Sequence, residues 1–141
     1  MRKFILSITA LLFSTIFYSQ GVIGKWKTID DETAKAKSII EIYEKSGKIY
    51  GKVIEILEAE NKKKVCSNCS GEDKNKPILG MVIIKGLSKE GNEYTFGKIL
   101  DPKNGKLYKC FIELEGKDKL KVRGYIGISL FGRTQYWYRV K

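Results

Sequence analysis

The feature that most constrains this chain is a hairpin around a two-residue turn at residues 46–47. A turn of this length fixes how the two flanking strands pair. It sets Glu41 opposite Lys52 on one face and Ile40 opposite Val53 on the other. Matched charges outside and branched aliphatics inside stabilise an antiparallel pair. The side chains expected to point into a core are Ile40, Ile42, Ile49 and Val53.

A second hairpin repeats this arrangement near the C-terminus. A three-residue turn at residues 116–118 sets Glu113 opposite Lys121 and Ile112 opposite Val122. Two registers, derived independently, therefore send aliphatic side chains to one side of a sheet and charges to the other. The chain is expected to be all-β.

Eight strand segments can be recognised from alternation and turn residues. The expected strands are residues 25–31, 38–44, 48–57, 78–87, 93–100, 107–115, 119–126 and 133–140. Most connections are short, which favours an antiparallel up-and-down order. The exceptions are residues 58–77, expected to cross one end of the sheet with a helical turn, and residues 101–105, whose loop length leaves the next register open. Eight such strands can close into a barrel that is filled by side chains or holds one small ligand.

The two ends of the chain carry residues suited to closing that barrel. Gly24 and Trp26 lie on the first strand, and Arg139 lies on the last. Closure makes these strands neighbours, so the guanidinium can stack on the indole. This arrangement resembles the lipocalin (calycin) signature. The resemblance implies that these three residues have a structural role at the base of the barrel.

The lumen is expected to contain aromatic side chains with polar ends. By alternation, Tyr136 and Tyr138 share a face, and with Trp26 and Tyr108 they form a candidate ligand-binding set. Arg133 is placed near one rim. A solidly packed barrel without a cavity remains the alternative. Arg123, Tyr125, Arg133 and Trp137 are open to two interpretations, an anion-binding or sugar-stacking patch and an outer face paired with acids.

The three cysteines divide into a pair and a single residue. Cys66 and Cys69 stand among Gly, Ser and Asn, where a disulfide that staples a loop fits an oxidising compartment. A redox pair and a metal site are the other interpretations. Metal ligation would need partners, and the chain has no histidine. Cys110 should face Gly124 on the inner side and remain free and buried.

The first twenty residues are expected to be a signal peptide. Arg2 and Lys3 precede an apolar run that is short for a membrane span. The mature chain, residues 21–141, is then a single domain, periplasmic or secreted, without a stable membrane span. It carries 25 basic and 16 acidic residues, a net charge of +9. Because the lysines are spread through every segment rather than clustered with arginines, no nucleic-acid binding is expected.

Catalysis is not expected from this composition. The absence of histidine removes the usual general base and the most common transition-metal ligand. The acids Asp30, Asp31 and Glu32 could suggest acid-base chemistry, but at a strand end beside lysines they are better interpreted as solvated turn residues. We therefore expect no enzyme activity, no catalytic residue, no cofactor and no metal.

Several segments together resemble the bacterial domain-of-unknown-function family 2147. They are Gly24-Lys-Trp26, Cys66-x-x-Cys69 with Asn75-Lys-Pro77, Ile99-Leu-Asp101-Pro102, Leu120-Lys-Val-Arg123-Gly124, and Trp137-x-Arg139. The resemblance covers nearly the whole mature chain and implies an exported lipocalin-like barrel, but no reaction. We expect it to bind a small amphipathic or anionic ligand in or at the mouth of the barrel. The alternative is an envelope protein whose basic outer face binds anionic polymer, lipid or a protein partner, with no internal void. The sequence leaves the oligomeric state open.

Overall fold

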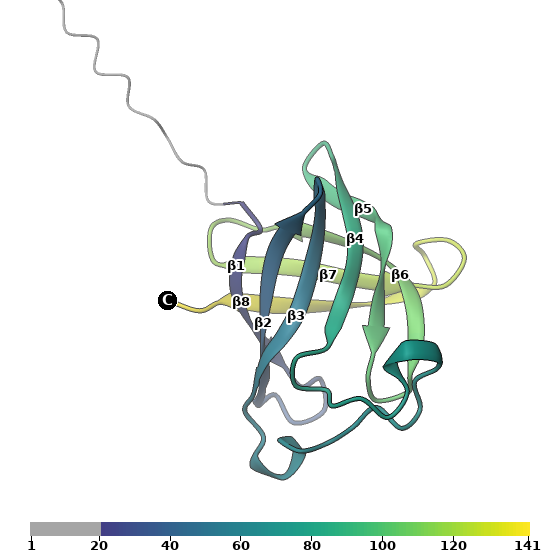
Figure 1. Cartoon of the computed structure of the whole chain (residues 1–141). Helices are drawn as coiled ribbons and strands as arrows, with labels where there is room; N and C mark the ends of the chain where they lie inside the picture. The colour runs from purple at the N-terminus through teal and green to yellow at the C-terminus, as the bar shows by residue number, and fades with distance from the viewer. Residues whose placement is uncertain (1–20) are drawn as a thin grey trace, which may run out of the picture.

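A computed structural model describes residues 21–141, so the expected signal peptide lies outside the described residues. Eight antiparallel strands follow one another around a closed barrel (Figure 1). They are β1 (Gly24–Ile29), β2 (Ala36–Lys45), β3 (Lys48–Ile56), β4 (Val82–Glu90), β5 (Glu93–Asp101), β6 (Lys106–Leu114), β7 (Lys119–Tyr125) and β8 (Gly132–Arg139). The expected eight-stranded up-and-down barrel is confirmed.

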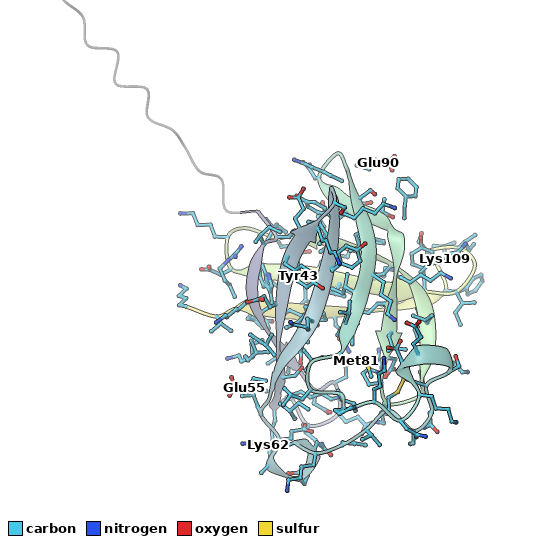
Figure 2. The ribbon with its side chains drawn as sticks, viewed as in Figure 1. Tyr43, Glu55, Lys62, Met81, Glu90 and Lys109 are labelled. Carbon is cyan, nitrogen blue, oxygen red and sulfur yellow. A yellow bond between two sulfur atoms is a disulfide. The ribbon has the colours of Figure 1, made fainter. Side chains whose placement is uncertain are left out.

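Both hairpin registers are also confirmed. Glu41 pairs with Lys52 between β2 and β3, and Ile112 pairs with Val122 between β6 and β7. The register that the sequence left open is settled by a four-residue loop, because Asp101 pairs with Lys106. Charged side chains such as Glu55, Lys62 and Lys109 extend away from the barrel (Figure 2).

The long connection between β3 and β4 lies at one end of the barrel, as expected. It contains two short 3-10 turns, η1 (Ala59–Asn61) and η2 (Gly71–Asp73). Strand β4 begins at Val82 rather than at residue 78, because Met81 N–H donates to the Ile78 carbonyl in a turn. No helix within residues 21–141 is long and apolar enough to cross a membrane.

The first and last strands meet and close the barrel. Trp26 on β1 pairs with Arg139 on β8. The Arg139 guanidinium lies 4.3 Å from the centre of the Trp26 ring, in the stacked position that the sequence suggested. The guanidinium donates hydrogen bonds to the carbonyls of Gly21 (2.8 Å), Ile23 (3.1 Å) and Lys117 (2.8 Å). A single side chain thus ties the entry of β1 to the β6–β7 turn.

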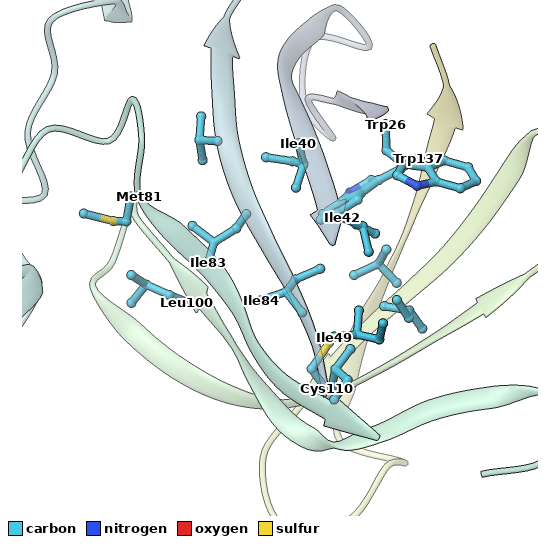
Figure 3. Close-up of a cluster of buried hydrophobic side chains, with 14 of the residues drawn as sticks. Trp26, Ile40, Ile42, Ile49, Met81, Ile83, Ile84, Leu100, Cys110 and Trp137 are labelled. Carbon is cyan, nitrogen blue, oxygen red and sulfur yellow. The ribbon is translucent and has the colours of Figure 1, made fainter. Parts of the chain in front are cut away.

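The core fills the end of the barrel where the chain enters and leaves. Figure 3 shows the two indoles of Trp26 and Trp137 beside Ile40 and Ile42. The side chains almost completely removed from solvent are Trp26, Trp137, Ile40, Ile42, Ile84, Leu87, Ile112, Leu120, Val22 and Cys110, together with Cys66 in the β3–β4 connection at the other end. The indole N–H of Trp26 donates to the Val22 carbonyl at 2.8 Å. This end is therefore closed by packing.

The orientation expected for the last strand was wrong. Tyr136 and Tyr138 are 38 % and 42 % exposed on the outer face, whereas Trp137 is buried. The reason is the β7–β8 register, which pairs Leu120 with Trp137 and so directs the indole inward. Aromatic residues at successive positions of β8 make its alternation ambiguous from sequence. Outside, the Tyr136 ring lies 4.3 Å from the Lys119 ammonium.

Candidate functional site

The opposite end of the barrel is open. Four connections surround it: β1–β2, β3–β4, β5–β6 and β7–β8. Between them lies a cavity of about 620 Å³ that extends inward to Trp137. This volume falls in the range of small-molecule sites in proteins. The sequence left a hollow and a solidly packed barrel as alternatives. The structure has both, because one end is packed and the other contains the cavity.

The wall of the cavity is mainly aliphatic. The side chains that line it lie on β2, β3, β4, β5 and β7 and are Ile40, Val53, Ile56, Ile83, Ile99, Leu100 and Val122. Alternation along the strands accounts for inward residues such as Ile40 and Val122, but not for both Ile99 and Leu100, which are adjacent on β5. Such a wall favours an apolar ligand body through the hydrophobic effect.

A short series of neutral polar groups interrupts this wall. The hydroxyls of Thr28 and Ser38 lie 2.7 Å apart. Trp137 Nε1 donates to Gln135 Oε1 at 3.3 Å. Gln135 Nε2 in turn donates to Asp31 Oδ2 at 3.0 Å. The chain of contacts runs from the buried indole to the mouth, so the interior is polar at defined points but uncharged.

Charge is confined to the mouth. Arg133 lies 3.5 Å from Asp31 and Lys103 lies 3.6 Å from Glu32, both in exposed pairs that contribute little stability. Lys37 and Lys64 also line the mouth. Neither of these two lysines forms an ion pair with any residue between 21 and 141. Neither ammonium is held in an ion pair, although the hydrogen bonds that lower the pKa of Asp30 are assisted by a smaller effect of the Lys37 charge.

Asp30 shapes the β1–β2 loop rather than acting as a proton donor. Its Oδ1 accepts the N–H groups of Thr33 and Glu32, each at 2.9 Å. The hydrogen bond from Thr33, then that from Glu32, lowers the pKa of this carboxyl below 3.8. A carboxylate held ionised in this way is a turn residue, as the sequence suggested.

The β3–β4 connection is fastened to the β5–β6 turn at the same mouth. Cys66 and Cys69 form a disulfide and are buried. Asn68 Nδ2 donates to the Lys103 carbonyl at 3.2 Å. At Gly105, a Cβ would overlap the Asn68 backbone, and its φ of +74° also favours glycine. The stapled loop therefore sets the shape of one side of the opening.

The third cysteine has no part in the mouth. Cys110 is free and buried against the closed end, as expected. Burial raises the pKa of its thiol to about 12, so the thiol is inert near neutral pH. No group of histidine, cysteine or carboxylate side chains within the described residues could hold a metal ion.

The structure separates the residues expected to bind ligand. Tyr108 and Arg133 line the cavity and its mouth. Trp26 lies in the core below it and does not line it, and Tyr136 and Tyr138 face away. The suggested surface group is also divided, since Trp137 is buried while Arg123 donates to the Ser129 carbonyl.

Sequence reasoning missed several lining residues. Thr28 and Ser38 could have been found, because they share the inward parity of Trp26 and Ile40. Gln135 was missed with Trp137, since the face of β8 was assigned the wrong way round. Phe131 lies in the β7–β8 loop, where no periodicity applies.

Comparison with known proteins agrees with this architecture. The chain is similar to a solved structure described as "Protein HP1028 from the human pathogen Helicobacter pylori belongs to the lipocalin family", with a TM-score of 0.77 and 22% identity, covering 87% of this chain and 85% of that one. At that identity the likeness shows the fold, which is lipocalin-like. No curated protein matches the sequence significantly. A family profile, "Uncharacterized protein conserved in bacteria (DUF2147)", matches residues 24–139. Since this match spans the entire barrel, the chain belongs to the bacterial family DUF2147.

Proposed function

We propose that this protein binds a small amphipathic molecule in the open half of the barrel, without catalysing a reaction. The observation that carries the proposal is the cavity of about 620 Å³, aliphatic along its wall and charged only at its mouth. The apolar body of the ligand lies against residues such as Val53 and Ile83. Its polar end remains at the opening. The alternative of a basic outer face without an internal void does not account for this hollow.

The mouth favours a negative polar end. Each of the five acids lining the mouth has a partner. Asp30 holds the β1–β2 loop, and Asp31 accepts from Gln135 and faces Arg133. Glu32 pairs with Lys103, Glu58 accepts from Asn61, and Asp101 accepts from the Lys103 N–H. Lys37 and Lys64 have no comparable partner among residues 21–141. A carboxylate or phosphate on the ligand would supply one. Exposed charges attract only modestly, so most of the affinity comes from the apolar body.

Export of the protein is part of the proposal. A buried disulfide in a stapled loop is typical of an oxidising compartment, and the leader sequence has the pattern of a signal peptide. Expression of the full chain in a bacterium, with cell fractionation and intact-mass analysis, tests this. A processed form near residue 21 outside the cytoplasm is expected. An unprocessed cytoplasmic chain would contradict it.

The binding proposal is tested with the fluorescent probe N-phenyl-1-naphthylamine. We expect saturable binding of one probe per chain, and displacement by dodecanoate better than by dodecanol or dodecylamine. Replacing Lys37 and Lys64 together by Gln should remove the preference for dodecanoate while leaving dodecanol unchanged. Failure of the probe and of all three competitors to bind would refute the proposal. An unchanged preference in the double variant would refute only the role given to the lysines.

A further inference from the structure

The loop between β7 and β8 exposes an unusual amount of apolar surface. Four of its large side chains, Ile126, Ile128, Leu130 and Phe131, are between 57 % and 79 % exposed. No charged residue occurs in residues 124–132. The loop projects from the side of the barrel (Figure 1, right). Contiguous exposed apolar side chains of this kind mark interaction sites.

Several backbone polar groups of this loop, mainly carbonyls, already have partners. Ile126 N–H donates to the Phe131 carbonyl, and Phe131 N–H donates to the Ile128 carbonyl, both at 3.0 Å. The Arg123 guanidinium donates twice to the Ser129 carbonyl, at 2.8 and 2.6 Å. Lys109, beside the loop in Figure 2, donates to the Gly127 carbonyl at 3.2 Å. These hydrogen bonds lower the cost of placing the loop in the interfacial region of a membrane, where water still reaches its other backbone groups.

Lysine side chains on neighbouring strands form a row on the outer surface that ends beside this loop. Lys98 on β5 is directly opposite Lys109 on β6, and Lys109 is opposite Tyr125 at the start of the loop. Lys85 on β4, paired with Lys98, is already neutralised by Asp73 at 2.7 Å, so Lys98 and Lys109 carry the free positive charge of this row. Like charges directly opposite one another destabilise a sheet. The repulsion between Lys98 and Lys109 is reduced when both face an anionic surface.

We propose that the tip of the β7–β8 loop inserts into the interface of an anionic lipid membrane. Ile128 and Leu130 enter the bilayer, while Lys98 and Lys109 face its headgroups. Apolar side chains flanked by lysine and arginine are the composition that binds at such interfaces. An anionic polymer would be met by the lysines but leaves the apolar tip in water, so the lipid surface fits both features. The proposal goes beyond ligand binding in the lumen and does not depend on it.

The loop also joins this surface to the cavity. Ile126 and Phe131 line the mouth, whereas Ile128 and Leu130 do not. Membrane docking through the tip therefore brings the opening of the barrel close to the lipid. It also allows the two functions to be separated by mutation.

The test uses protein expressed as the full chain, with its N-terminus determined by mass, and vesicles of phosphatidylcholine alone or mixed equally with phosphatidylglycerol. We expect cosedimentation with the mixed vesicles, weakened by salt. The double variant Ile128→Ser/Leu130→Ser should reduce this binding by roughly tenfold or more. Lys98→Glu should reduce it by roughly fivefold or more. The matched control is Phe96→Ser, which removes another exposed apolar side chain and should leave binding unchanged.

Three results would overturn the proposal. They are absence of binding to the mixed vesicles, equal binding by the double variant, and a dimer in solution that the double variant converts to monomer. The last result would assign the loop to contact between two copies of the chain. N-phenyl-1-naphthylamine should bind the double variant as it binds the parent protein, so loss of docking is distinguishable from loss of the lumen site.

Discussion

Replacing Arg139 by Ala should destabilise the barrel more than the substitution of any other charged residue among residues 21–141. The Arg139 side chain is only 11 % exposed, and it contacts both the Trp26 ring and three backbone carbonyls. The stacking contributes about 1 kcal/mol. Water can replace the guanidinium at the carbonyls, so each hydrogen bond contributes about 0.5–1 kcal/mol net.

Together these contacts predict a loss of about 2.5–4 kcal/mol in the free energy of unfolding. For a domain of this size that lowers Tm by roughly 8–16 °C. Thermal and urea unfolding followed by tryptophan fluorescence measure both quantities.

The matched control lies on the same strand. Arg133→Ala removes an arginine whose side chain is 67 % exposed and makes one ion pair at 3.5 Å. Its cost should be below about 1 kcal/mol. Equal destabilisation by the two substitutions would refute the assignment of Arg139 as the residue that closes the barrel.

Four further predictions concern the three cysteines and the β5–β6 turn. Replacing Cys66 and Cys69 by Ser opens a very small covalent loop and should cost about 2 kcal/mol, measured by urea unfolding; an unchanged midpoint would contradict the staple. Cys110 should not react with a thiol reagent at pH 8 until the protein is unfolded, when one thiol per chain appears. Because burial raises the pKa of Cys110 from 9.0 to about 12, its stabilising contribution is complete below pH 9 and declines as the pH rises toward 12; Cys110→Ala should flatten that decline, and a parallel pH profile would exclude this cause. Gly105→Ala should cost about 2 kcal/mol or more, from overlap with Asn68 and a strained positive φ, and a neutral substitution would show that the two loops are not in contact.

The sequence predicted the elements whose position is fixed by local chemistry. The two-residue turn at Gly47 and the opposed pair Glu41 and Lys52 determine a register without any distant contact. The pairing of Trp26 with Arg139 could be predicted because the first and last strands of a closed up-and-down barrel must be neighbours.

The cavity could not be predicted in the same way. Whether Tyr138 or Trp137 faces inward depends on the β7–β8 register across a glycine-rich bend, and aromatic residues occupy both alternating positions. The cavity exists because the inward side chains occupy less volume than the barrel encloses, and alternation does not report volumes. Alternation shows which side chains point inward. It does not show that the lumen is filled at the closed end, near Trp137, and empty at the open end, near Thr28.

The most direct test of the account compares Val53→Phe with Lys52→Phe in titrations with N-phenyl-1-naphthylamine. Val53 lines the lumen and is buried, whereas its neighbour Lys52 pairs with Glu41 on the outer face. We predict that Val53→Phe weakens probe binding at least about tenfold while the protein still unfolds cooperatively, because the added ring occupies the cavity. Lys52→Phe should bind as the parent protein does. Equal affinity in the two variants would contradict binding inside the barrel.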